Sequence, residues 1–240
     1  SNQEGQAGYQ VGTDWRPLTF SQIGAFDLAE VVFAGYGIVA PATDAYEEYD
    51  SFVHLDVTDK WVLVFRYLPE GIDAKHRQHL NRHASLRYKA MAARDRGARG
   101  LVVVSGPNTK VKDQLVKLSF DASLAGTSIA ALSITDVLAQ EWLGQGGKSL
   151  KDLQTALDTG QPRAGFPITS LGIGAAIDIR QEKRNGRNVL ARLSASSDTP
   201  APGMVVVGAH IDHLGNGAGN GSLAREEEKG QIHYGADDNA

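Results

Sequence analysis

Residues 204–215 read Met-Val-Val-Val-Gly-Ala-His-Ile-Asp-His-Leu-Gly and set the expected fold of the second half of the chain. The β-branched run is too short for a helix and is followed at once by polar side chains. This is typical of a buried strand that presents polar groups at its carboxyl end. Open α/β sheets place their ligand sites at that edge. The stretch therefore predicts an α/β sheet with a site at the end of this strand.

The polar residues after this run have the chemistry of a metal site. His210 and Asp212 lie two positions apart, so an extended chain would point both side chains to the same side. The carboxylate can then accept the N–H of a metal-binding imidazole and fix its tautomer. Farther along, Asp237 and Asp238 are adjacent carboxylates, which a cation would neutralise. Imidazole and carboxylate without thiolate suit zinc or another borderline divalent ion. Each piece alone also fits a polar strand end or a turn, and only their combination favours a metal site.

Segments 208–215 and 235–240 together resemble the signature of the co-catalytic dizinc aminopeptidases, the family of the bacterial leucyl aminopeptidases. The resemblance implies a site with two Zn²⁺ ions, in which His210 binds one ion, Asp237 bridges both and Asp212 orients His210. It implies removal of amino-terminal residues from peptide or protein substrates by a zinc-activated water. It also implies an extracytoplasmic location, periplasmic or secreted.

The match to this family is incomplete. The family's site also needs a Glu general base, an adjacent Glu ligand, a further Asp and a second His, all beyond the Asp-Asp motif. The sequence ends two residues after that motif. We therefore expect residues 168–240 to form the amino-terminal part of the zinc aminopeptidase domain. Alone, they should bind zinc weakly or not at all and lack peptidase activity.

Composition limits the other classes of function. The chain has 240 residues, 42% hydrophobic and 22% charged, which leaves room for one or two cores. A net charge of −4 provides no global basic field to recruit nucleic acid. The absence of cysteine excludes disulfides and thiolate chemistry. No apolar run approaches the ~20 residues of a membrane span, and residues 1–16 read as a polar leader.

Residues 17–167 alternate short apolar runs with helical patterns. Four runs read as strands, and the first is interrupted by two glycines, which indicate a bulge or a close backbone approach. These runs are 31–39, 61–66, 101–105 and 128–134. An amphipathic pattern predicts a helix over about 84–96 that ends at Gly97. Thr135 and Ser149 are placed to cap two further helices.

This order of elements resembles a protease-associated domain, a β-rich α+β fold. The resemblance rests on residues 32–38, 59–64 and 89–100 and covers about 17–167. In this peptidase family such a domain is inserted early in the catalytic domain. There it caps the active-site cleft or takes part in substrate access and protein contacts.

From residue 168 the pattern becomes a meander. Residues 172–180 read as a strand, Asn185-Gly186 is a hairpin signal, and 188–193 read as the returning strand. These runs and the 204–209 strand look like the first strands of an α/β/α zinc-peptidase sheet.

Other interpretations stay open. The basic stretch over 75–99 is better explained by an amphipathic helix than by a nucleic-acid patch, because stacking aromatics are not interleaved with it. His76, His79 and His83 are expected to be surface histidines, since no nearby carboxylate completes a metal cluster. The main alternative function is a non-catalytic binding module, either a protease-associated domain or a receptor-like relative without metals. A related zinc fold that cyclises amino-terminal glutamine ranks below both.

Overall fold

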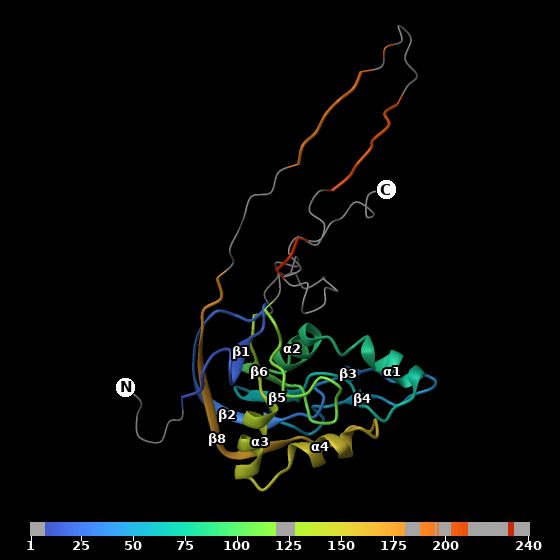
Figure 1. The fold of residues 1–240 in the computed structure, drawn as a ribbon. Helices are drawn as coiled ribbons and strands as arrows, with labels where there is room; N and C mark the ends of the chain where they lie inside the picture. The colour runs from blue at the N-terminus through green and yellow to red at the C-terminus, as the bar shows by residue number, and fades with distance from the viewer. Residues whose placement is uncertain are drawn as a thin grey trace. The chain divides into compact units, whose positions relative to one another are not determined.

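The computed structural model describes residues 8–118, 128–180, 188–194, 196, 203–210 and 230–232. The chain divides into two compact units, Ser1–Gln181 (unit 1) and Glu182–Ala240 (unit 2). The helices and strands of the described residues all belong to unit 1 (Figure 1). The predicted domain boundary at 167/168 falls inside the last strand of unit 1, so that strand is shared between the two predicted domains.

Unit 1 is built from short strands and four helices within the described residues. In chain order they are β1 (Trp15–Pro17), β2 (Gly24–Phe33), β3 (Val39–Ala40), β4 (Tyr49–Asp50), β5 (Trp61–Phe65), α1 (Ala74–Asn81), α2 (Leu86–Arg94), β6 (Gly100–Val104), β7 (Ala130–Ile134), α3 (Asp136–Gln145), α4 (Leu150–Leu157) and β8 (Phe166–Ile177).

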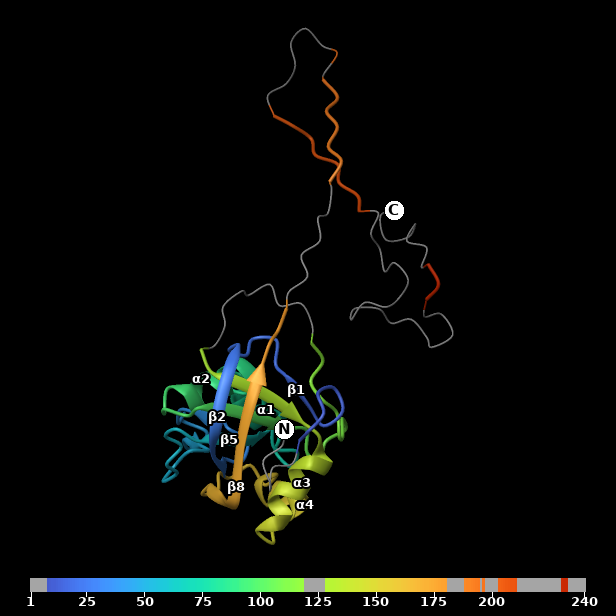
Figure 2. The same cartoon turned by 90° about the vertical axis from the view of Figure 1, so that its left-hand side faces the viewer.

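The main sheet has six strands in the order β1-β7-β6-β5-β2-β8. Its four central strands, β2, β5, β6 and β7, are parallel. The edge strands are antiparallel to their neighbours, β1 to β7 and β8 to β2, and Figure 2 shows β8 alongside β2. Strands β3 and β4 form a separate pair. The fold is thus mixed α/β with a parallel centre, which is less β-rich than the expected α+β domain.

Both faces of β5, β6 and β7 are buried, which explains their almost wholly apolar sequences. Along β5, Trp61, Leu63 and Phe65 enter the core on the face covered by α3 and α4. Val62 and Val64 enter the core on the opposite face, which α2 covers (Figure 1). Successive side chains of a strand point to opposite faces, so only a strand covered on both sides tolerates five apolar residues in a row.

Helix α2 is attached to the end of β5 by a buried lysine. Lys89 is fully buried, and its Nζ donates to the carbonyl oxygens of Phe65, Arg66 and Tyr67 at 2.7, 3.1 and 2.9 Å. Burial lowers the pKa of Lys89 well below its usual range, while the three acceptors oppose that shift because they stabilise the ammonium form. The contact holds the chain in place just beyond the strand.

Replacing Lys89 with methionine should destabilise unit 1. The Lys89→Met side chain keeps the aliphatic packing but leaves three carbonyl groups without their donor, which we expect to cost about 3 kcal/mol and to lower the melting temperature by about 10 °C. Thermal unfolding followed by circular dichroism measures this. The matched control is Lys75→Met on exposed α1, which should stay within about 0.5 kcal/mol of the parent. Equal melting temperatures for the two variants would contradict the role given to Lys89.

Two glycines allow close packing on β5. Gly100 pairs with Trp61 across β5 and β6, and a Cβ at Gly100 would overlap the indole ring. Gly37 has φ +63°, and a Cβ there would lie 2.8 Å from Cγ1 of Val64. The predicted strand over 31–39 ends at Phe33. The two glycines that interrupt the predicted run, Gly35 and Gly37, both have positive φ and lie in the turn that follows β2.

Alanine at Gly100 should destabilise unit 1, whereas alanine at Gly144 should not. Gly100→Ala forces the Trp61 ring to move, an overpacking cost of about 1–3 kcal/mol. Gly144 lies within α3, where a Cβ meets only Gln140 Nε2 at 3.6 Å. Gly144→Ala should therefore stabilise the helix by about 0.5–1 kcal/mol. Urea unfolding of both variants measures the change in unfolding free energy, which should be a decrease for Gly100→Ala and an increase for Gly144→Ala. A destabilised Gly144→Ala variant would contradict the open space found around this position of α3.

The helix starts confirm the two caps predicted from sequence and add two more, Asp73 at α1 and Ser85 at α2. The side chain of Thr135 accepts from Leu138 N at the start of α3, and that of Ser149 accepts from Asp152 N at the start of α4. The helix predicted over 84–96 is α2. Helix α1 was not predicted, although its cap, Asp73, accepts from two backbone N–H groups of the first turn.

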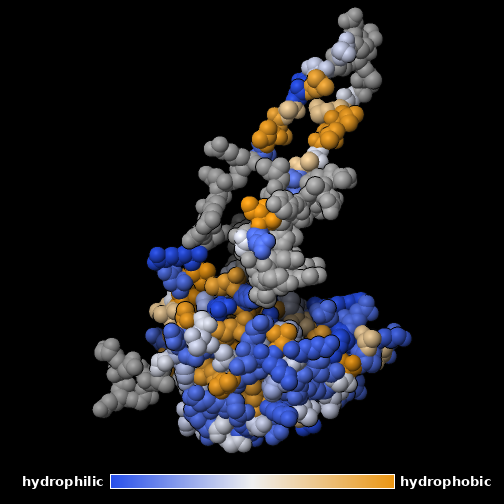
Figure 3. All heavy atoms as spheres, viewed as in Figure 1, coloured by the Kyte–Doolittle hydropathy of each residue, from blue (hydrophilic) through white to orange (hydrophobic). Residues whose placement is uncertain are grey.

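The described parts of unit 2 differ from the prediction. Residues 203–210 contain no strand, and the side chains of Met204 to Val207 are 82–90% exposed. The return strand over 188–193 is likewise not formed, and Val189 and Leu190 are exposed. Figure 3 shows apolar spheres in orange among the described residues of this unit. The prediction of a buried strand here is wrong for the described residues, because none of them pairs with these runs or covers them. The Asn185-Gly186 hairpin lies outside the described residues.

No helix in the described part of the chain combines the length and apolar character needed to cross a lipid bilayer.

Candidate functional site

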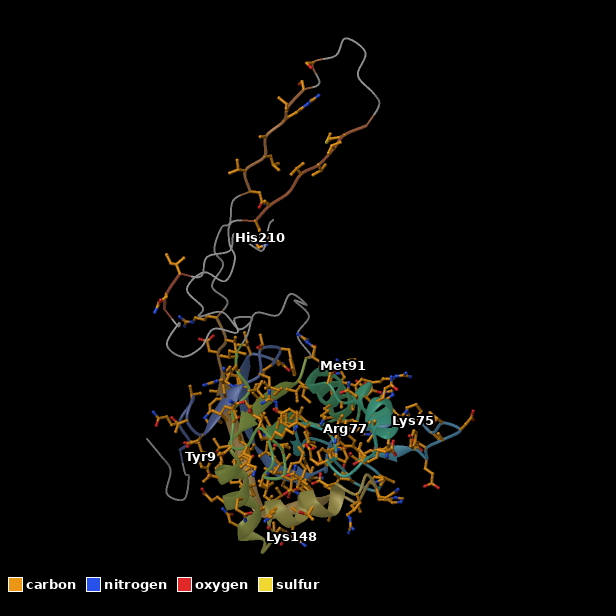
Figure 4. The ribbon with its side chains drawn as sticks, turned by 45° about the vertical axis from the view of Figure 1, so that its right-hand side comes forward. Tyr9, Lys75, Arg77, Met91, Lys148 and His210 are labelled. Carbon is orange, nitrogen blue, oxygen red and sulfur yellow. The ribbon has the colours of Figure 1, made fainter. Side chains whose placement is uncertain are left out.

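The residues predicted to bind zinc are only partly within the described structure. His210 is the last described residue of segment 203–210 and is exposed (Figure 4). Asp212 and Asp237 lie outside the described residues, as does Asp238. Among the described residues, no three His, Cys, Asp or Glu side chains are grouped so that they could hold a metal ion. The distance between His210 and Asp237, on which the zinc prediction depends, is therefore untested.

Unit 1 has a pocket of about 540 Å³ near the carboxyl ends of β5 and β6. Its wall comes from the segment after β5, from α1 and the residues just after it, and from the loop after β6. The lining residues are Arg66, Tyr67, Leu68, Glu70, Arg77, Asn81, Ala84, Thr109, Lys110 and Val111. Crevices at the carboxyl ends of parallel strands are where α/β proteins bind ligands. We therefore call this the edge pocket and treat it as the candidate site.

Two loops that reach the edge pocket are joined by the carboxylate of Asp158. Its Oδ1 accepts from Glu70 N at 3.0 Å, after β5, and its Oδ2 accepts from Asn108 Nδ2 at 2.8 Å, after β6. The Tyr36 hydroxyl also donates to Oδ1, at 2.5 Å. Burial first, and the hydrogen bond to Asp158 second, raise the pKa of Tyr36 far above its usual value. The phenol therefore stays a donor, and the two loops keep one arrangement.

The loop after β6 is also held at its other side. Gly106 N donates to Asp136 Oδ1 at 2.8 Å, and Asp113 N donates to Asp136 Oδ2 at 2.9 Å. Between them, Thr109 Oγ1 is buried, 2.8 Å from the carbonyl oxygen of Gly106. The carboxylate at the start of α3 thus organises the loop that forms one wall of the edge pocket.

The edge pocket carries more positive than negative charge. Its ionisable lining groups are three cations, Arg66, Arg77 and Lys110, and one anion, Glu70. Arg77 Nη2 donates to the carbonyl oxygens of Pro69 and Glu70 at 3.0 and 3.2 Å and lies 3.5 Å from Glu70 Oε2. Arg77 is therefore committed to the loop and to Glu70, which leaves the other two cations in excess.

One nitrogen of Arg66, Nη1, differs from the other charged groups of the edge pocket because it is shielded and has no hydrogen-bond partner among the described residues. The guanidinium carbon of Arg66 lies 4.9 Å from the centre of the Tyr67 ring. A shielded donor on a charged group without an acceptor is costly. The Arg66 side chain as a whole is partly exposed and lines the edge pocket, so its positive charge is available to an anionic group there.

The three histidines expected at the surface, His76, His79 and His83, pack against one another and against two tyrosines, and we call this row of aromatic rings the ring column. Tyr46 stacks on His76 at 4.5 Å and on His79 at 5.5 Å between ring centroids. His83 follows at 6.0 Å from His79 and contacts Tyr88 at 5.2 Å. His79 Nε2 and His83 Nδ1 are shielded and have no hydrogen-bond partner among the described residues. The side chains are half-buried, so the prediction of surface histidines is wrong in this respect.

The ring column should make unit 1 less stable in acid. Burial, above all, lowers the pKa of His76 and His83 below 6.5, although Asp73 opposes the shift at His76 while His79 and Arg82 add to that at His83. The unfolded chain therefore takes up protons at higher pH than the folded chain does, and stability falls as pH drops below about 6.5. Replacing both residues by phenylalanine should flatten this dependence. Urea unfolding between pH 8 and pH 5 tests it, and an unchanged slope in the double variant would refute it.

Sequence reasoning missed both the edge pocket and the ring column. One signal for the column was present, because His76, His79 and His83 follow the spacing of one helical face. The edge pocket had no comparable motif. Its residues come from three separate segments of the chain, and only the strand order brings them together.

Comparisons with known proteins give one structural similarity. No protein-family model matches the chain, and no curated protein matches it. Among solved structures, it is similar to an aminopeptidase from Aneurinibacillus sp. strain AM-1, with 23% sequence identity and a TM-score of 0.33. The alignment covers 57% of this chain and 26% of that one. The matched part therefore spans about a quarter of the length of that aminopeptidase.

Proposed function

We propose that this chain is part of a zinc-dependent aminopeptidase that removes amino-terminal residues from peptides. The observation that carries the proposal is the pair of segments 208–215 and 235–240, whose His-x-Asp and Asp-Asp patterns combine the donors that zinc prefers. The enzyme would work outside the cytoplasm.

The donors fit the metal in kind but not in number. His210 would ligate one Zn²⁺, Asp237 would bridge two, and Asp212 would accept the N–H of the His210 ring nitrogen that does not bind zinc and so fix the orientation of the ring. When bound, zinc lowers the pKa of a water to about 7 and so supplies the nucleophile. Each ion needs four ligands, so further ligands and a general base must come from outside the motif.

Within this proposal, residues 17–167, which make up most of unit 1, are a protease-associated domain. The core of unit 1, with both sheet faces covered, supports an independently folded module. The antiparallel pairing of β2 with β8 places Gly24 beside Ile177 at one edge of the sheet, whereas β1, earlier in the chain, lies at the opposite edge. The close spacing of Gly24 and Ile177 suits a domain inserted into another. Its role would be substrate access or protein contacts near the catalytic cleft.

The proposal predicts zinc-dependent hydrolysis by the longest natural chain that contains these residues. Leucyl or alanyl p-nitroanilide should be cleaved, chelation should stop the reaction, and His210→Ala or Asp237→Ala should lower kcat/KM by at least ~100-fold. Asp212→Asn should cost ~10–100-fold, because it disturbs only the orientation of the imidazole. The matched control is His54→Asn, which removes an exposed imidazole from unit 1 at a position with φ +56° that asparagine tolerates.

The 240-residue chain alone should show no hydrolysis and little zinc in elemental analysis. Zinc-dependent hydrolysis by these 240 residues that disappears in His210→Ala would overturn the expected inactivity. A longer chain with no bound zinc and no hydrolysis would reject the enzyme. That outcome would favour the second candidate, a non-catalytic binding module, which the separate core and pocket of unit 1 support.

A further inference from the structure

We propose that the edge pocket of unit 1 binds an organic carboxylate, presented by a short peptide either as an acidic side chain or as a free carboxyl terminus. The proposal goes beyond the peptidase function and does not depend on it, because the pocket is formed within unit 1. Arg66 is the principal binding residue and Lys110 assists it.

The charge balance calls for an anion. Glu70 is paired with Arg77, whose Nη2 is also held by two backbone carbonyls. Arg66 and Lys110 remain as the unbalanced cations of the lining. A bound carboxylate would reduce this excess from two positive charges to one without breaking the contact between Arg77 and Glu70.

The state of Arg66 favours a carboxylate that accepts hydrogen bonds directly. Nη1 is shielded and has no acceptor among the described residues, while the Tyr67 ring lies 4.9 Å from the guanidinium carbon. The ring contact limits the orientations of the guanidinium group. A guanidinium presents its N–H groups in a planar fork that matches the two oxygens of a carboxylate. The partly exposed Arg66 side chain lines the pocket, so its charge and its planar group can act on a carboxylate bound there.

The size and lining favour an organic ligand over an inorganic ion. A volume of about 540 Å³ lies within the range of small-molecule sites, roughly 300–1,000 Å³. Leu68, Ala84 and Val111 add apolar surface beside the charged groups. Such a wall is suited to aliphatic parts of a ligand, and the polar side chains of Asn81 and Glu70 in the lining are suited to amide groups. A peptide that carries a carboxylate has all three features.

The network behind the pocket makes it a preformed site. Lys89 fixes the carbonyls of Arg66 and Tyr67, and Asp158 joins the loops after β5 and β6. The backbone on these two sides is therefore in place before a ligand arrives. A preformed site does not need to order its loops on binding, which favours affinity for a small ligand.

Isothermal titration of the complete 240-residue chain tests the proposal with four probes. They are acetyl-Ala-Glu-amide, its neutral counterpart acetyl-Ala-Gln-amide, acetyl-Ala-Leu with a free carboxyl terminus, and inorganic phosphate. At least one of the two carboxylate peptides should bind, and acetyl-Ala-Gln-amide should bind at least ~10-fold more weakly. Binding of the first peptide identifies a side-chain carboxylate as the ligand, and binding of the third identifies a carboxyl terminus.

Variants connect the binding to the edge pocket. Arg66→Gln should weaken the best probe by ~10-fold or more, and exposed Lys110→Gln should weaken it by a smaller factor. The matched control is Arg180→Gln, whose side chain is 88% exposed and outside the pocket, and it should leave affinity unchanged. Circular dichroism checks folding, and Lys110→Gln keeps the test decisive if Arg66→Gln does not fold.

Three results would overturn the proposal. The first is that neither carboxylate peptide binds folded protein at millimolar concentration. The second is that the neutral peptide binds as tightly as the acidic one. The third is that phosphate alone binds, which would make the pocket a site for inorganic ions.

Discussion

The arrangement of unit 1 depends on one buried ammonium group. Lys89 extends from α2 across the sheet edge, and its three hydrogen bonds to successive carbonyls fix the backbone from Phe65 to Tyr67. An extended chain that leaves a sheet has carbonyls without ladder partners, and burying them without donors is unfavourable. The Lys89 side chain supplies the hydrogen-bond donors for the carbonyl groups of three residues. These bonds also fix the backbone positions of Arg66 and Tyr67, which form one wall of the edge pocket.

The same edge is held by carboxylates from the other face of the sheet. Asp158, just after α4, accepts hydrogen bonds from the loops that follow β5 and β6, and Asp136, at the start of α3, accepts from the backbone of the second loop. Helices on both faces thus contribute charged groups that hold loops at the carboxyl ends of the strands. The loops themselves contain little regular structure, so their order comes from these side chains rather than from ladders or helical bonds.

Local patterns in the sequence predicted local structure well. Strands β5, β6 and β7 could be predicted because they are buried on both faces and so appear as continuous apolar runs, whereas only the last three residues of β2 are buried and were predicted. Helices α3 and α4 could be predicted because Thr135 and Ser149 are typical caps. Helix α1 escaped prediction because only Leu80 in it is buried, which leaves no apolar stripe. The parallel centre of the sheet could not be predicted, since strand order depends on contacts between distant segments.

The two candidate sites differ in how far sequence could predict them. The two halves of the zinc motif are short sequence patterns that can be recognised without a structure. The predicted site also requires that His210 and Asp237 lie close together, and Asp237 is outside the described residues. The edge pocket is the reverse case. Arg66, Arg77 and Lys110 are ordinary basic residues in the sequence, and only the fold places them around one pocket.

The pairing of β2 with β8 has a topological consequence. Gly24 and Ile177 are direct partners in the ladder, so their backbones are separated by only about 5 Å, the spacing of neighbouring strands. The segment 24–177 therefore starts and finishes at neighbouring backbone positions, so a short linker could join its two ends, as circular permutation requires. Strand β1, which precedes this segment, pairs with β7 at the opposite edge of the sheet and would have to be carried on a separate connection.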